Sequence, residues 1–124
     1  MADMVRDIQG VRVLICANDG PPLSQERDAN AFMSAAWEQN AALVAIPTSR
    51  LTDDFFRLST RLAGSVIQKF VNYQVRLAVV GDISAWVDAS AAFRDFVYEA
   101  NNGQAVWFVN DLAGLDRLLS LRKA

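Results

Sequence analysis

The sequence predicts an α/β domain built on a mostly parallel sheet of four or five strands. Four short apolar segments alternate along the chain with longer segments whose apolar residues recur at helical spacing. Strands that are apolar on both faces are typical of parallel sheets covered by helices. We therefore expect the order β-α-β-α-β-α-β-α in a single domain over residues 1–124, with residues 1–10 as a lead-in to the first strand.

The first half of the chain gives two strands and one helix. Residues 11–17 are rich in β-branched side chains and stop at a turn-forming Asn-Asp-Gly-Pro-Pro segment, so they predict a strand and a loop. The stretch before the helix leaves room for a short extra strand near Pro22 and Leu23. Ser24 is the expected N-cap of a helix whose inward residues are Ala29, Phe32, Met33, Ala36 and Trp37. Residues 41–46, closed by Pro47, form the second predicted strand.

The second half gives two strands and three helices. Thr52, followed by two aspartates, is expected to cap a long helix that ends near Tyr73. Gly64 in its middle suggests a close approach by another backbone. Residues 76–80 and 105–109 are the remaining strands, separated by a helix from about Ser90 to Gly103. A short helix closes the chain, with leucines at Leu112, Leu115, Leu118, Leu119 and Leu121.

Composition excludes several classes of function. Hydrophobic residues are 52% and charged residues 21%, as in ordinary globular proteins. Because the net charge is -2, there is no positive field to attract nucleic acid. The sequence has no histidine, which removes Ser-His, Cys-His and His-metal chemistry. No apolar run reaches membrane-span length, and a single cysteine without a signal peptide favours the cytoplasm.

Several ordered segments resemble the bacterial family filed as domain of unknown function 4180. The resemblance runs from about residue 51 to residue 108, with a looser likeness in the first strand and helix. It is carried by Phe55, Phe56, Gly64, Gln68, Lys69, Phe70, Tyr73, Gly81, Asp82, Phe96, Glu99 and Asn101. In the family pattern an acidic residue often follows the Ala-Gly pair, where this chain has Ser65, and a glycine is common at the position of Arg61. The resemblance implies a small protein with no established activity.

The element order is also similar, at the level of the fold, to the anti-sigma-factor-antagonist domain called STAS. Regulators of that type carry a phosphorylatable residue near the positions of Ser49 and Thr52 here. No Gly-rich phosphate loop or dinucleotide fingerprint occurs in the sequence, so no cofactor is expected. Thr52 has a simpler interpretation as a helix cap, which leaves Ser49 as the more open candidate.

Three aspartates follow predicted strands and suggest an enzymatic alternative. In a parallel sheet, ligands bind beyond the carboxyl ends of the strands. Asp19, Asp82 and Asp111 would share that edge and could hold Mg²⁺ for phosphoryl chemistry. The simpler interpretation is that they cap loops, as Asp often does where a strand ends.

The leading functional prediction is a non-enzymatic regulatory or protein-binding module. Its expected working surface lies at the second and third predicted strands, near Ser49, Thr52, Asp82 and Trp86. Trp86 has no periodic pattern that would bury it, and tryptophan is favoured at interfaces. A small-molecule binder at the same edge is the other alternative. Cys16 is expected to be an inert core residue, and Trp37 and Trp107 are expected to be buried.

The closing helix suggests self-association. Its five leucines exceed what one narrow stripe beside a four-stranded sheet would need. An exposed apolar patch on such a domain often marks an interface. We therefore predict a homodimer, with Leu121 as the residue to test.

Overall fold

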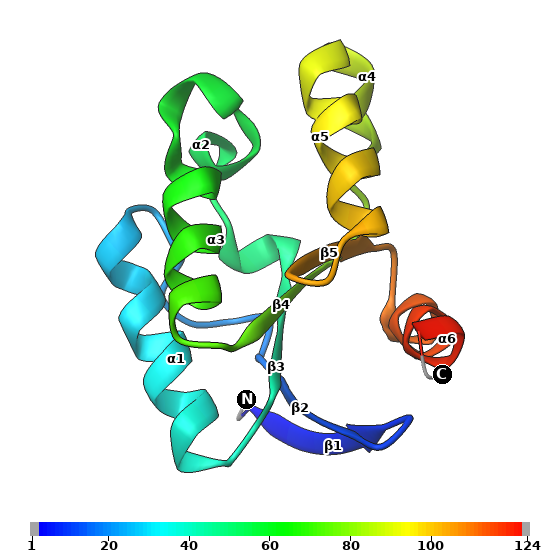
Figure 1. The fold of residues 1–124 in the computed structure, drawn as a ribbon. Helices are drawn as coiled ribbons and strands as arrows, with labels where there is room; N and C mark the ends of the chain where they lie inside the picture. The colour runs from blue at the N-terminus through cyan, green and yellow to red at the C-terminus, as the bar shows by residue number, and fades with distance from the viewer. Residues whose placement is uncertain (1–2, 123–124) are drawn as a thin grey trace.

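The computed structural model of the chain describes residues 3–122 and has one five-stranded sheet, in the order β1-β2-β3-β4-β5 (Figure 1). Its parallel strands are β2 (Val11–Ile15), β3 (Leu43–Pro47), β4 (Arg76–Val80) and β5 (Val106–Val109). At one edge, β1 (Met4–Ile8) pairs antiparallel with β2. The predicted α/β class with a mostly parallel sheet is confirmed.

The fifth strand comes from the segment predicted as a lead-in, so that prediction was wrong for residues 4–8. Gln9 and Gly10 both have positive φ, at 51° and 81°, and form the two-residue turn that joins β1 to β2. The strand was missed because charged residues interrupt its apolar pattern. Near Pro22 the structure has only an isolated bridge, which joins Leu23 to Leu51.

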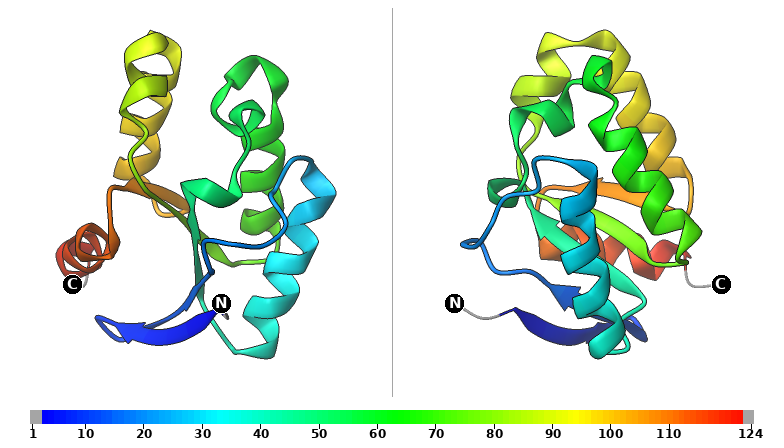
Figure 2. Two further views of the ribbon diagram at one scale, coloured as in Figure 1. Left: turned by 180° about the vertical axis from the view of Figure 1, so that it is seen from behind. Right: turned by 90° about the vertical axis from the view of Figure 1, so that its left-hand side faces the viewer.

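Helices cover the two faces of the sheet unequally (Figures 1 and 2). The "three-helix face" is covered by α1 (Ala29–Glu38), α3 (Leu62–Asn72) and α5 (Ala91–Asn102). The "α6 face" is covered by α6 (Leu112–Arg122). Side chains alternate between the faces along each strand: on β3, Val44 and Ile46 enter the core of the three-helix face, and Leu43 and Ala45 that of the α6 face.

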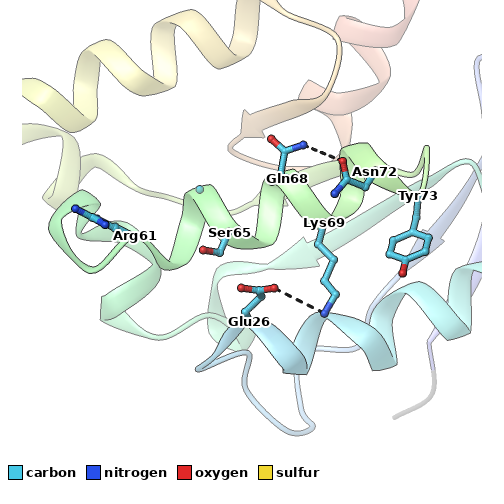
Figure 3. A pocket seen from close by; sticks show the side chains of 8 residues that line it. Glu26, Arg61, Ser65, Gln68, Lys69, Asn72 and Tyr73 are labelled. Carbon is cyan, nitrogen blue, oxygen red and sulfur yellow. Dashed lines mark hydrogen bonds and ion pairs between the residues drawn. The ribbon is translucent and has the colours of Figure 1, made fainter.

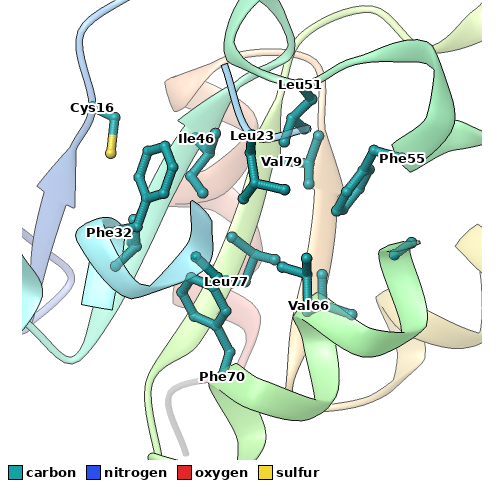
Figure 4. Close-up of a cluster of buried hydrophobic side chains, with 14 of the residues drawn as sticks. Cys16, Leu23, Phe32, Ile46, Leu51, Phe55, Val66, Phe70, Leu77 and Val79 are labelled. Carbon is teal, nitrogen blue, oxygen red and sulfur yellow. The ribbon is translucent and has the colours of Figure 1, made fainter. Parts of the chain in front are cut away.

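The larger core lies under the three-helix face, where Phe55, Phe70 and Phe93 are buried (Figure 4). On the α6 face, Trp107 is fully buried as predicted, and its indole N–H donates to the Gly103 carbonyl at 2.9 Å. Trp37 contradicts its prediction, because it lies at the end of α1 with 52% of its surface exposed.

The long helix predicted from Thr52 to Tyr73 is broken. It consists of α2 (Asp53–Phe56), a 3-10 turn η3 (Leu58–Thr60) and α3. Arg61 joins the last two with φ +66°, a left-handed conformation that no helix interior allows. The apolar stripe continues in phase across the break, so periodicity alone did not reveal it. Gly64 is exposed, and a Cβ there would meet no described atom within 4 Å, so the predicted close approach is wrong.

Helix ends follow local hydrogen bonding. Ser24 does not cap α1, because a 3-10 turn, η1 (Glu26–Asp28), precedes that helix and Asp28 accepts from the Ser24 and Gln25 N–H groups. Ser90 does cap α5 as predicted, its Oγ accepting from the Phe93 N–H at 3.1 Å. The segment before it, in which no helix was predicted, forms α4 (Ser84–Ala89).

The leucines of α6 have different environments. Leu115 and Leu119 are buried against the α6 face, whereas Leu112 and Leu118 are half-buried. Leu121 has 79% of its surface exposed. The homodimer through this helix stays a prediction, and light scattering of the chain and of Leu121→Lys tests it.

Candidate functional site

An apolar groove of about 210 Å³ lies at the carboxyl ends of the parallel strands. β2, β3 and β4 end at the same edge of the sheet, and the loop after β2 forms the groove's rim through Ala17 and Asn18. The remaining lining is mostly apolar: Met4, Ile15, Cys16, Ala45, Pro47, Val80 and Leu112. Leu112, the first residue of α6, lines one side of the hollow. We call this hollow the "edge groove"; it lies where open parallel sheets bind ligands.

Cys16 lines the edge groove but is not activated. Burial raises the pKa of its thiol to about 12, the negative charge of Asp3 adds to the increase, and Arg50 opposes it. The thiolate is the nucleophilic form of cysteine, so the neutral thiol acts as a small apolar group at physiological pH. Its prediction as a core residue is confirmed by an exposure of 5%.

Arg50 fixes the rim of the edge groove. It ends the 3-10 turn η2 (Thr48–Arg50) after β3, and only 9% of its surface is exposed. Its Nε donates to the Pro21 carbonyl and its Nη1 to the Ala17 carbonyl, both at 2.9 Å. The guanidinium also lies 5.0 Å from the centre of the Phe32 ring. Two hydrogen bonds thus tie residues 17–21 to Arg50, and the Phe32 contact joins Arg50 to α1.

Sequence reasoning missed Arg50, although a signal for its role exists. Gly20 has φ +134°, and a Cβ there would lie 2.9 Å from the Arg50 Cζ. The Asn-Asp-Gly-Pro-Pro segment therefore leaves space for a cation beneath it. An arginine three residues after the next buried strand was the available candidate.

The four residues predicted to bind do not gather around one hollow. Ser49 is exposed at the rim, where its Oγ donates to the Asn18 carbonyl at 3.1 Å. Thr52 precedes α2, but its hydroxyl faces the Leu23 carbonyl at 3.5 Å and makes no cap bond. Asp82 accepts from the Ser84 N–H at 2.9 Å, which lowers the pKa of its carboxyl group and starts α4. Trp86 is half-buried and its ring stacks on that of Phe56, with ring centres 4.1 Å apart.

The three aspartates of the enzymatic alternative do not form a metal cluster. Within residues 3–122, no group of three or more His, Cys, Asp or Glu side chains could hold a metal ion. Strand order gives one reason, because β3 separates the strands that Asp19 and Asp82 follow. Asp111 accepts from the Gly114 N–H at 2.7 Å in the first turn of α6. Asp82 and Asp111 thus act as helix-start residues, the simpler interpretation of their pattern.

A second hollow, the "polar groove", lies beside α3 and has a volume of about 520 Å³ (Figure 3). Four residues that carry the family resemblance line it: Gly64, Gln68, Lys69 and Tyr73. Within it, the Lys69 Nζ lies 3.9 Å from the Glu26 Oε2, and Gln68 donates to the Asn72 side chain at 2.9 Å. Arg61 and Ser65, where this chain departs from the family pattern, also line it.

An exposed pair of aromatic rings adjoins the polar groove. Tyr73 and Trp37 meet edge to face, with ring centres 5.4 Å apart, and about half of each side chain is exposed. Sequence reasoning assigned Trp37 to the core because its position fits the inward stripe of α1. Trp37 lies in the last turn of α1, where its ring contacts that of Tyr73 and not the core of the domain.

The remaining family positions have structural roles. Phe55, Phe56 and Phe70 are core residues, and Phe96 packs against that core. Gly81 has φ +144°, and any Cβ there would overlap the Thr48 side chain. The side chain of Asn101 binds the backbone of Phe108 in β5. Glu99 is exposed on α5.

Comparisons with known proteins agree with the sequence resemblance. No curated protein and no solved structure matches the chain, so the likeness to STAS domains stays a prediction. No helix within residues 3–122 has both the length and the apolar character to cross a membrane. The model of the domain of unknown function DUF4180 matches residues 8–119, from the end of β1 to the middle of α6. The chain therefore belongs to the DUF4180 family.

Proposed function

We propose that this chain is a non-catalytic binding module that receives one apolar side chain of a protein partner in the edge groove. The observation that carries the proposal is the groove itself, an apolar hollow at the carboxyl ends of β2, β3 and β4. In this class of fold, that edge is where ligands bind. Exposed apolar hollows rimmed by polar groups are typical of interaction sites.

The size of the groove favours a side chain over a larger ligand. Pockets for drug-sized molecules have volumes of roughly 300 to 1,000 Å³. At about 210 Å³, the edge groove falls below that range. A leucine or phenylalanine side chain from a partner suits this volume, since the remainder of the interface would rest on the rim.

The chemistry around the groove supports binding rather than catalysis. The Cys16 thiol is neutral, and the nearby Ser49 hydroxyl donates to a backbone carbonyl. The sequence has no histidine to act as a general base for either group. The rim is held by Arg50, so the groove is formed before a partner arrives, which reduces the entropy cost of binding.

A titration of isotope-labelled protein with N-acetylleucinamide, followed by NMR, tests the proposal. We expect the amide signals of Ile15, Asn18 and Val80 to shift at millimolar probe. Val80→Phe should abolish these shifts, because the larger ring fills the groove. Val109→Phe is the matched control, since Val109 neighbours Val80 on the same sheet face but does not line the groove.

Two outcomes would count against the proposal. One is a set of shifts that lie elsewhere or survive in Val80→Phe. The other is a response to benzyl alcohol with none to N-acetylleucinamide. The second result would favour the alternative function, a binder of small apolar molecules at the same groove.

A further inference from the structure

The two edges of the sheet are finished differently. At the β5 edge, the Asn101 Oδ1 accepts from the Phe108 N–H at 2.7 Å, and the Asn101 Nδ2 donates to the Phe108 carbonyl at 3.2 Å. The backbone of Val109 points to the β4 side, where its carbonyl accepts from the N–H of Gly81, the residue that follows β4. Phe108 therefore faces outward, and the Asn101 amide supplies both hydrogen bonds that Phe108 would make to a further strand. Asn101 thus blocks strand pairing at Phe108.

The β1 edge is open. On β2, the Arg12 carbonyl and the Cys16 N–H form hydrogen bonds on the side of β3. The backbone groups of successive residues in a strand point alternately to its two neighbours, so those of Val13 point to β1. The cross-strand register pairs Val13 with Arg6, which therefore turns its backbone groups inward to β2. Val5 and Asp7 turn theirs outward, and nothing within residues 3–122 pairs with them.

The charges of β1 oppose pairing with a second copy of itself. Three antiparallel registers join the outward-facing residues of two copies. Pairing Val5 with Val5 places Asp3 opposite Asp7, pairing Val5 with Asp7 places Arg6 opposite Arg6, and pairing Asp7 with Asp7 joins like charges directly. Like charges directly opposite each other destabilise a sheet. A second copy is therefore a poor occupant of this edge.

A hollow beside this edge favours a basic side chain. It has a volume of about 440 Å³ and lies between the start of the chain and the end of α1, lined by Asp3, Val5, Ala35 and Glu38 among others. Its lining thus combines the carboxylates of Asp3 and Glu38 with apolar surface from Val5 and Ala35, and Asp3 Oδ1 accepts from the Ala17 N–H at 2.8 Å. A lysine or arginine can lay its apolar stem on such a surface and place its charged end at the carboxylates.

We propose that β1 is a docking strand for an extended segment of another protein, which adds a sixth strand to the sheet. The segment carries Lys or Arg on the three-helix side, facing Asp3, Asp7 and Glu38. Main-chain hydrogen bonds to Val5 and Asp7 supply the general affinity, and the basic side chains supply the selectivity. Met4 of β1 also lines the edge groove, but its backbone faces β2, whereas the docking groups are the outward backbone groups of Val5 and Asp7. The two proposals can therefore be tested separately.

Two synthetic peptides test the docking strand. Acetyl-Lys-Val-Lys-Val-Lys-amide should shift the amide signals of Val5 and Asp7 and slow their hydrogen exchange. Its counterpart with Glu in place of each Lys should bind at least tenfold more weakly. Val80→Phe fills the edge groove and should leave both results unchanged.

Three variants separate backbone pairing from charge. Asp7→Pro removes the outward N–H and should abolish binding of the lysine peptide. The variant should still fold, because proline is tolerated where an edge strand faces solvent. Asp7→Asn keeps the N–H and should weaken binding only a few fold. Glu38→Lys lies on α1 and leaves β1 intact, so it answers the question even if the proline variant fails to fold. Glu38→Lys should weaken binding of the lysine peptide and strengthen binding of the glutamate peptide.

Equal binding of the two peptides would overturn the proposal. So would shifts that map to β5 instead of β1, or no shift at millimolar lysine peptide. Unchanged affinity in both folded Asp7→Pro and Glu38→Lys would overturn it as well.

Discussion

The three-helix face and the α6 face of the sheet are built from the same strands but differ in how their side chains pack. The three-helix face holds one continuous core in which aromatic rings from α2, α4, α5 and β5 touch one another. The α6 face buries a smaller set around Trp107, with the small residues Ala45 and Ala78 side by side on neighbouring strands. Three helices pack on one face, whereas a single helix packs on the other and leaves the apolar edge groove beside it. Stability is thus concentrated on the first face, and the apolar hollow lies on the second.

The largest expected effect comes from the aromatic core. Phe93 is fully buried, and its ring contacts Phe56 and Phe108 with centres 6.0 Å apart in each pair. Phe93→Ala should lower the free energy of unfolding by about 3 to 5 kcal/mol, because it removes apolar contact and leaves a cavity. Urea unfolding measures the change. Tyr98→Ala on the same helix, where 71% of the side chain is exposed, should change stability by about 0.5 kcal/mol or less.

Leu115→Ala is the corresponding substitution on the α6 face, and urea unfolding again measures the change in the free energy of unfolding. Leu115 is fully buried there but has no aromatic cluster around it. We expect a loss at the lower end of the usual range for leucine, about 2 to 3 kcal/mol. A loss that equals or exceeds that of Phe93→Ala would contradict the assignment of stability mainly to the three-helix face.

Cys16 tests whether water reaches the boundary between the faces, since it belongs to the three-helix core and also lines the edge groove. Its pKa in the folded chain is about 12, above the value of 9.0 for an unperturbed thiol. Above pH 9 the unfolded chain therefore releases a proton that the folded chain keeps, so stability falls as pH rises. Between pH 9 and 10.5 the loss should be about 2 kcal/mol more than in Cys16→Ala. Equal pH profiles for the two proteins would mean that the thiol is hydrated.

Much of the fold was predictable because each predicted element carried a local signal. The strands β2 to β5 are apolar runs, and α5 has both a serine cap and a glycine stop. Hidden elements lacked such a signal. The alternating charges of β1 suit an open edge of a sheet and hide it from hydropathy, while α4 spans only six residues.

The candidate site was less predictable because it depends on what is left uncovered. The carboxyl edge was the expected location, and the edge groove lies there. Its shape, however, depends on the position of α6 beside the sheet and on the Arg50 contacts, neither of which has a periodic signature. Trp86 shows the converse: it was selected as an exposed aromatic residue, but tertiary packing stacks it on Phe56.

The smallest expected effect concerns the break between α2 and α3. Arg61 has φ +66°, a conformation that glycine adopts without strain, and the sequence resemblance implies that a glycine is common at this position in the family. Arg61→Gly should raise the free energy of unfolding by about 0.5 kcal/mol, the strain relieved less the added freedom of the unfolded chain. Thermal unfolding measures it. Arg57→Gly is the control and should be destabilising, because Arg57 has an ordinary φ of -103°.

The amide of Asn101 limits how far any assembly through this sheet can grow. A sheet with two free edges is a template that copies can extend without end, as in a fibril. Here the Asn101 amide occupies the outward-facing backbone groups of Phe108 in β5, and the like charges of β1 disfavour pairing with an identical strand. The proposed docking at β1 would therefore add one foreign strand to the sheet without starting an assembly of identical copies.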